Sequence, residues 1–105
     1  MCEMSVHNGV AYLAGQIAED SAQDIGGQTR QVLAAIDALL ARVGTDKTRV
    51  LRAQVFLADM ADYNIMNTVW EQWVAPGHAP ARATVQAALA KPQWKVEIVV
   101  TAALP

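Results

Sequence analysis

The chain has 105 residues, of which 53% are hydrophobic and only 17% charged, with a formal net charge of −2 and a pI of about 5.5. This length suits one domain, expected over residues 1–105, and the acidic balance argues against a protein that binds nucleic acid through a clustered basic face. The hydrophobic residues are spread out, without the roughly 18 to 20 consecutive apolar residues of a membrane helix, so their surplus predicts a contact between subunits.

The cysteine and histidine content predicts a cytoplasmic protein without a metal site. Cys2 is the single cysteine, so an internal disulfide is impossible, which suits a reducing compartment. His7 and His78 stand alone, without the paired spacing that zinc ligands have.

The first predicted element is a β-hairpin. Asn8-Gly9 suits the positive φ angles of a type I′ turn, and residues 5–7 and 10–15 on either side of it have the character of strands. The polar segment 17–24 that follows predicts a loop.

A helix and a third strand come next. From about residue 24 to residue 43 the apolar residues recur at helical spacing, and Gly44 stands where a residue in the left-handed conformation ends many helices. Residues 47–58 predict a strand in which Leu51, Ala53, Val55 and Leu57 share one face, while Val50 and Phe56 make the opposite face partly apolar too.

The last part of the chain predicts a second helix and two more strands. Asp62 can cap the helix, and Ala75-Pro76-Gly77 ends it. Its buried stripe would comprise Ile65, Met66, Val69, Trp70 and Trp73. The strands span 81–89 and 94–103, and in the second Val96, Ile98, Val100 and Ala102 point one way while Lys95, Glu97, Val99 and Thr101 point the other.

These elements follow one another in the order ββαβαββ, which predicts an α+β fold. Two helices can cover only one face of a sheet, and the other face of this sheet also carries apolar side chains. Closed assembly of identical chains is the usual way to bury such a face.

Arg82 and Glu97 are the strongest candidates for a functional pair. If the last two strands form an antiparallel hairpin, these residues lie opposite each other. They would then form either a structural ion pair or a site in which the arginine holds an anion and the glutamate moves protons. The loop 77–81 before Arg82, and the isolation of Glu97 in an otherwise apolar strand, favour a functional site.

Five short motifs along the chain carry a resemblance to a known family. They are Gly15-Gln16-Ile17, Gln28-Thr29-Arg30-Gln31, Asp62-Tyr63 through Met66-Asn67, Pro80-Ala81-Arg82-Ala83-Thr84-Val85 and Val96-Glu97-Ile98. In order and spacing they resemble the RidA family, also called YjgF or reactive intermediate deaminases. Three further segments look closest to its YoaB-like branch, namely Phe56-Leu57-Ala58-Asp59, Trp70-Glu71-Gln72-Trp73 and Gly77-His78-Ala79-Pro80.

The resemblance implies a chorismate-mutase-like fold, with one mixed sheet and two helices packed on one of its faces. It also implies a homotrimer in which the sheets line a central barrel and ligands bind in clefts between subunits. Family members hydrolyse imines and enamines of the 2-aminoacrylate type to 2-oxo acids and ammonia, without a metal or an organic cofactor.

The resemblance further implies roles for five residues of this chain. Arg82 would hold the substrate carboxylate, and Glu97 would position or activate the hydrolytic water. Gly15 would offer its backbone N–H to the carboxylate, and Asn67 and Thr84 would contribute to substrate binding.

Two departures from the family pattern keep other functions open. Ala14 stands where many members carry Ser or Thr, and the sequence begins almost at its first hairpin, without the segment in which many members carry a site tyrosine. A carboxylate-binding trimer without turnover, serving as a sensor or partner module, is therefore an alternative. A ribonuclease or translation inhibitor is a third, against which the acidic pI and the scattered basic residues count.

Overall fold

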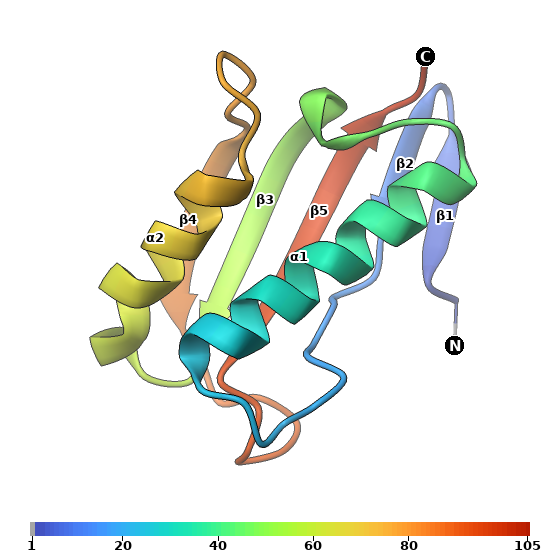
Figure 1. Cartoon of the computed structure of the whole chain (residues 1–105). Helices are drawn as coiled ribbons and strands as arrows, with labels where there is room; N and C mark the ends of the chain where they lie inside the picture. The colour runs from blue at the N-terminus through green and yellow to red at the C-terminus, as the bar shows by residue number, and fades with distance from the viewer. Residues whose placement is uncertain (1) are drawn as a thin grey trace.

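The computed structural model describes residues 2–105 and shows a mixed sheet with two helices across one face (Figure 1). The strands are β1 (Met4–His7), β2 (Val10–Leu13), β3 (Val50–Leu57), β4 (Ala81–Gln86) and β5 (Val96–Ala103). The helices are α1 (Ile25–Arg42) and α2 (Tyr63–Trp73). Between them the chain forms the short 3-10 helix η1 (Lys47–Arg49), strand β3 and a second short 3-10 helix, η2 (Met60–Asp62). The predicted α+β class and the order ββαβαββ are confirmed.

The strands lie across the sheet in the order β1-β2-β5-β3-β4, with β3 and β4 parallel and the other pairs antiparallel. The expected hairpin of β4 and β5 is therefore wrong, because β3 lies between them. The cause is α2, since a strand–helix–strand connection brings the chain back to the same end of the sheet and sets β4 parallel to β3. Residues 87–95 then carry the chain past the end of β3, and β5 pairs with β3 and β2.

The first hairpin and the first helix are confirmed. Asn8 and Gly9 have φ angles of 51° and 75°, as a type I′ turn requires, and β1 pairs antiparallel with β2. Asp24 caps α1, because its carboxylate accepts a hydrogen bond from the Gly27 N–H at 2.8 Å. Gly44, with a φ of 74°, lies just beyond the helix end.

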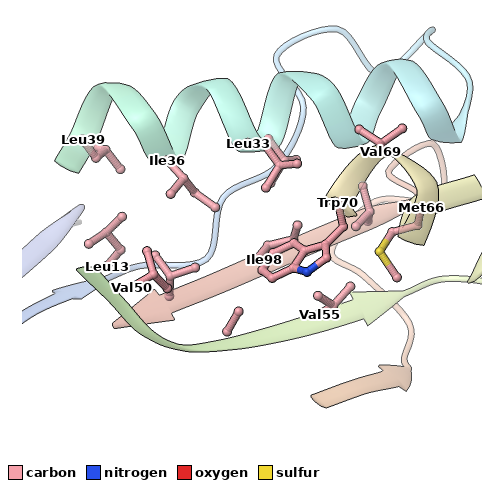
Figure 2. Close-up of a cluster of buried hydrophobic side chains, with 14 of the residues drawn as sticks. Leu13, Leu33, Ile36, Leu39, Val50, Val55, Met66, Val69, Trp70 and Ile98 are labelled. Carbon is pink, nitrogen blue, oxygen red and sulfur yellow. The ribbon is translucent and has the colours of Figure 1, made fainter. Parts of the chain in front are cut away.

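The hydrophobic core lies between the sheet and the helices (Figure 2). Strand β5 runs through its middle and points alternate side chains into it, as predicted: Val96, Ile98, Val100 and Ala102, none more than 1% exposed. Helix α1 adds Val32, Leu33, Ile36 and Leu40, and helix α2 adds Met66, Val69 and Trp70. This packing fixes which face of the sheet each neighbouring side chain occupies.

Strand β3 begins later than predicted and contains an irregularity. Residues 47–49 form η1, and the pairing of β3 with β5 shifts between Val50 and Arg52. The shift leaves Leu51 without a partner in the ladder, so Leu51 is 52% exposed and Val50 is buried in its place. The prediction that Leu51 shares one face with Ala53, Val55 and Leu57 is therefore wrong, and Val50 lies on the buried face instead of the opposite one.

The start and the outer side of α2 also differ from the prediction. Asp62 makes no capping hydrogen bond, because η2 leads directly into the helix and Asp59 caps η2 instead, accepting from the Ala61 N–H at 2.9 Å. Ile65 is 54% exposed, whereas Met66, Val69 and Trp70 are buried and Trp73 packs half-buried against the core.

The second face of the sheet is not covered by any element of the described chain and still carries apolar side chains (Figure 1). Phe56 and Val99 are half-buried there, and Tyr12 and Val85 are 49% and 44% exposed. These positions alternate with core residues along each strand, as the sequence predicts. Neither helix of residues 2–105 has both the length and the hydropathy to cross a bilayer.

Candidate functional site

Arg82 lies near the start of the edge strand β4 and points to the helix side of the sheet. Its neighbour in the ladder is Ala53, which is fully buried under the helices. Its guanidinium stacks over Trp70, 5.1 Å from the ring centroid, and its Nη2 donates a hydrogen bond to the Tyr63 hydroxyl at 3.1 Å. Two aromatic residues of α2 therefore hold this cation in one orientation.

Two buried polar atoms beside this position have no hydrogen-bond partner among residues 2–105. They are Nη1 of Arg82 and Oγ1 of Thr84, which lies two residues further on the same face of β4. Arg82 also forms no ion pair with the described acidic residues. Buried polar atoms in native proteins nearly always have partners, so this pair calls for an acceptor from a ligand or from another chain.

Arg82 and Asn67 line the same cavity, which has a volume of about 860 Å³ and lies between α2 and the loop before β4. Asn67 is half-buried, and its Nδ2 donates to Glu71 on the next helical turn at 3.2 Å. The structure thus brings Arg82 and Asn67 to one cavity, and Thr84 lies two residues from Arg82 on the same face of β4.

Glu97 lies near the start of β5, between the buried Val96 and Ile98, and therefore points to the uncovered face. Its carboxylate occupies the space into which a side chain at position 15 would extend, so a Cβ on Gly15 would overlap it. The close approach explains the glycine. Gly15, just after the end of β2, and Glu97 on β5 thus form a second group of candidate site residues.

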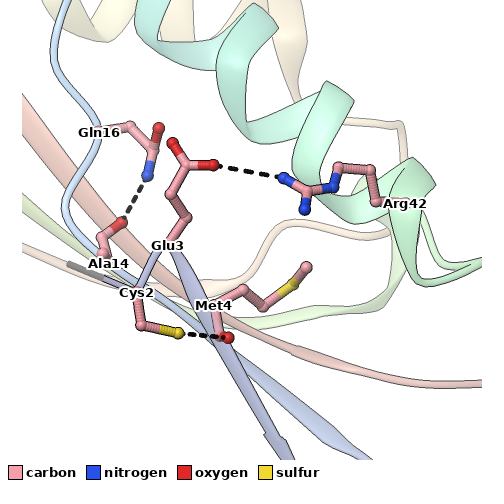
Figure 3. A network of polar contacts seen from close by, with 6 residues as sticks. All are labelled: Cys2, Glu3, Met4, Ala14, Gln16 and Arg42. Atoms are coloured by element: carbon pink, nitrogen blue, oxygen red, sulfur yellow. Dashed lines mark hydrogen bonds and ion pairs between the residues drawn. The ribbon is translucent and has the colours of Figure 1, made fainter.

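Several hydrogen bonds hold the segment around Gly15, and Figure 3 shows the one from the Gln16 side chain to the Ala14 carbonyl. Gln16 exchanges backbone hydrogen bonds with Ile98 at 2.9 and 3.1 Å, and its Nε2 donates to the Ala14 carbonyl at 2.9 Å. The Ala14 N–H donates to the Glu3 carbonyl at 2.8 Å. Gly15 also lines a cavity of about 660 Å³ with residues of the loop 91–94.

The two groups are separated within one chain. Arg82 and Glu97 belong to strands on either side of β3, and the paired residues are offset by three positions, which puts their Cα atoms about 14 Å apart. The offset is odd, so the side chains also point to opposite faces. The expected direct contact of Arg82 with Glu97 is wrong for a single chain, and so is a structural ion pair between them.

Sequence reasoning missed the contacts that Tyr63 and Trp70 make with Arg82. Trp70 was expected to be a packing residue, and Tyr63 appeared only within a motif. Their spacing of seven residues places both on one face of α2, which is the signal that could have found them. Among residues 2–105 no cluster of three His, Cys, Asp or Glu side chains could hold a metal ion.

Comparison with known proteins places these groups in a family. A family model described as Endoribonuclease L-PSP matches residues 3–104. A RutC family protein of Haemophilus ducreyi is 55% identical over 102 residues, which cover 97% of this chain and 87% of the relative. The RutC family protein YoaB of Escherichia coli is 44% identical over 102 residues, which cover 97% of this chain and 89% of the relative.

The chain belongs to the RidA/YjgF family. The similarity to YoaB supports its assignment to the YoaB-like branch. A crystal structure of a member of the YjgF protein family from Neisseria meningitidis superimposes with a TM-score of 0.95 at 48% identity, covering 98% of this chain and 86% of that chain. The chorismate-mutase-like fold expected for a RidA/YjgF protein is therefore confirmed.

Proposed function

We propose that this protein is an imine/enamine deaminase that hydrolyses 2-imino and 2-enamino acids of the 2-aminoacrylate type to 2-oxo acids and ammonia. The observation that carries the proposal is the environment of Arg82. This cation is fixed by Tyr63 and Trp70, faces a cavity, and has a buried Nη1 with no partner among the described residues. It stands where the RidA/YjgF resemblance expects the arginine that binds the substrate carboxylate.

A small carboxylate matches the groups at this position. The planar guanidinium can bind two carboxylate oxygens at once, and a hydrogen bond to a charged group contributes about 1.5 to 3 kcal/mol. The Thr84 hydroxyl is a second buried donor on the same face, and the Asn67 amide lies on the cavity wall. These groups would hold the substrate by its acid end.

The proposed site is completed by a second copy of the chain. Glu97 and Gly15 lie on the far side of β3 from Arg82, so one chain cannot bring them to the same substrate. The uncovered sheet face, with Phe56 and Val99, gives the copies an apolar surface on which to associate. We propose a homotrimer whose sheets surround a central barrel, with Arg82 of one subunit facing Glu97 of the next.

The reaction needs only proton transfers and a positioned water. Water adds to the carbon of the protonated imine while Glu97 accepts a proton from the water, and this forms a neutral tetrahedral carbinolamine. Glu97 then gives this proton to the amine nitrogen, the C–N bond breaks, and the hydroxyl becomes the carbonyl of the 2-oxo acid as its proton passes to the departing ammonia. A positioned carboxylate accelerates such steps by about 10²- to 10⁴-fold, so the proposal includes no metal or organic cofactor.

An RNA-directed activity has weaker support. The matching family model is described as Endoribonuclease L-PSP, but this chain has a net charge of −2 and only eight lysines and arginines, whereas RNA binding draws on clustered basic residues.

The test generates 2-imino acids in situ with an amino acid oxidase and follows the formation of 2-oxo acid with and without the protein. We expect acceleration by the wild-type protein, loss of it in Arg82→Ala, and no effect of Arg49→Ala, a matched change at an exposed arginine. Arg82→Ala should also weaken the binding of a small carboxylate by about 10- to 100-fold and leave the oligomer size unchanged.

Three outcomes would change the proposal. Carboxylate binding without acceleration, across imines from several amino acids, would replace the deaminase with a binding module. Binding and cleavage of RNA would favour the endoribonuclease. Smaller oligomers or aggregates of Arg82→Ala would show that the arginine has a structural role instead.

A further inference from the structure

Gln28 is a fully buried polar side chain in the first turn of α1, and all of its hydrogen bonds leave the helix. Its Nε2 donates to the backbone carbonyls of Ser21, Gln23 and Gln93 at 3.2, 3.1 and 3.1 Å. Its Oε1 accepts from the Lys95 N–H at 2.9 Å. One amide thus uses both of its N–H groups and its oxygen on the backbone of the loop before α1 and of the distant loop before β5.

One of these loops contains Gly15, and the other leads to Glu97, whose carboxylate is the proposed catalytic group and lies against Gly15. The segment 21–23 belongs to the loop after β2 that contains Gly15, and the segment 93–95 ends two residues before Glu97. The carboxylate of Glu97 rests against Gly15. The Gln16–Ile98 bridge holds the backbone on one side of this contact, and the segments bound by Gln28 hold it on the other. Lys95 is held on its other side as well, since its carbonyl accepts from the Ala58 N–H at 3.0 Å.

We infer that Gln28 is a positioning residue that sets the Glu97 carboxylate against Gly15 by clamping the two loops together. Buried groups with complete hydrogen bonding hold one geometry, because each alternative leaves a donor or acceptor unpaired away from water. The catalytic consequence of this clamp rests on the proposed deaminase function. The structural consequence, a fixed Glu97, does not.

Thr29 provides a matched control in the next position. It is also fully buried in the first turns of α1, but its hydroxyl donates only to the Ile25 carbonyl of the same helix, at 2.8 Å. A residue that merely stabilises α1 would behave like Thr29. A residue that positions Glu97 would not.

The experiment records the carboxyl carbon signals of the protein labelled with ¹³C-glutamate. The chain has four glutamates, and Glu97→Gln identifies the signal of Glu97 by its loss. We expect Gln28→Met, which keeps the shape and removes the hydrogen bonds, to move the Glu97 signal. Its kcat for imine hydrolysis should fall by about 10- to 100-fold while KM stays the same, because Arg82 is untouched.

The control and a second variant keep the inference falsifiable. Thr29→Val should lower Tm without moving the Glu97 signal or kcat. If Gln28→Met does not fold, Gln28→Glu keeps the acceptor for the Lys95 N–H, removes the donors at neutral pH, and should move the same signal.

An unchanged Glu97 signal in a folded Gln28 variant would overturn the inference, and so would an equal shift in Thr29→Val. If the wild-type protein hydrolyses no imine, the proposed function fails while the carboxyl signal still decides whether Gln28 positions Glu97.

Discussion

Arg82 and Glu97 lie on strands separated by β3 and point to opposite faces of the sheet. A substrate small enough to be a 2-imino acid cannot bridge them within one chain, since about 14 Å of strand and sheet separates their Cα atoms. If both act on one substrate, they act from different subunits, and this relationship can be tested by mixing variants.

Co-assembly of Arg82→Ala with Glu97→Gln should restore activity that each variant lacks alone. In a cyclic oligomer assembled at random from equal amounts, about a quarter of the sites receive an intact arginine from one chain and an intact glutamate from its neighbour. The measurement is imine hydrolysis by the co-expressed proteins. As a control, Arg82→Ala co-assembled with the double variant Arg82→Ala/Glu97→Gln should stay inactive, and a mixture no better than its components would reject the shared site.

Gly15→Ala should lower kcat by about 10- to 100-fold with little loss of stability. The new Cβ overlaps the Glu97 carboxylate, which is the mobile end of a flexible side chain and can move aside at low cost. Kinetics and thermal melting measure the two effects. Gly9→Ala should have the opposite effect. The φ of 75° at Gly9 strains an alanine by about 1 to 2 kcal/mol, so the stability of the fold should fall. Gly9 lies far from Arg82 and from Glu97, so activity should persist. Full activity of Gly15→Ala would contradict the role of this contact.

Val99→Asp should dissociate the oligomer or prevent its assembly. Val99 is half-buried in the middle of the uncovered sheet face, and a carboxylate there would be costly to bury between subunits. Light scattering after size exclusion gives the mass. Ile65→Asp introduces the same charge at a 54% exposed position on the outer side of α2 and should leave the mass unchanged. An oligomer of normal mass in Val99→Asp would show that this face is not the interface.

Asp46 should make the stability of the fold depend on pH at the acid end. A hydrogen bond from the Thr48 hydroxyl, followed by one from the Thr48 backbone N–H, lowers the pKa of Asp46 below its usual 3.8. Because the pKa of Asp46 is lower in the folded state than in the unfolded state, the ionised carboxylate stabilises the fold at pH values above the unfolded-state pKa. This stabilisation is lost as the pH falls through the folded-state pKa. The difference in Tm between the wild-type protein and Asp46→Asn should therefore be largest above about pH 5 and shrink below about pH 4.

Thr48→Val tests the cause of that dependence. It keeps the Asp46 carboxylate and removes the hydroxyl that lowers its pKa most, so the shrinkage at acid pH should weaken. A difference between wild type and Asp46→Asn that stays constant over the same pH range would contradict the assignment.

The parts of the fold that the sequence predicted correctly depend on short-range signals. The Asn8-Gly9 turn, the capped α1 and the alternation along β5 each follow from neighbouring residues and from burial on one face. The predictions for Leu51 and Ile65 were wrong because a β-bulge and a narrow helix contact changed which residues point into the core. Neither feature can be recognised from the local sequence pattern.

The sequence by itself predicted the order of the elements, the apolar second sheet face and the candidate residues Arg82 and Glu97, because side-chain periodicity and family motifs can be recognised from neighbouring residues. Only the tertiary structure decided which strands are neighbours. Pairing depends on how α2 and residues 87–95 route the chain, and that routing placed β3 between Arg82 and Glu97. Two strands that follow each other in sequence need not touch, so the distance between two side chains is a property of the sheet order and not of their spacing in the chain.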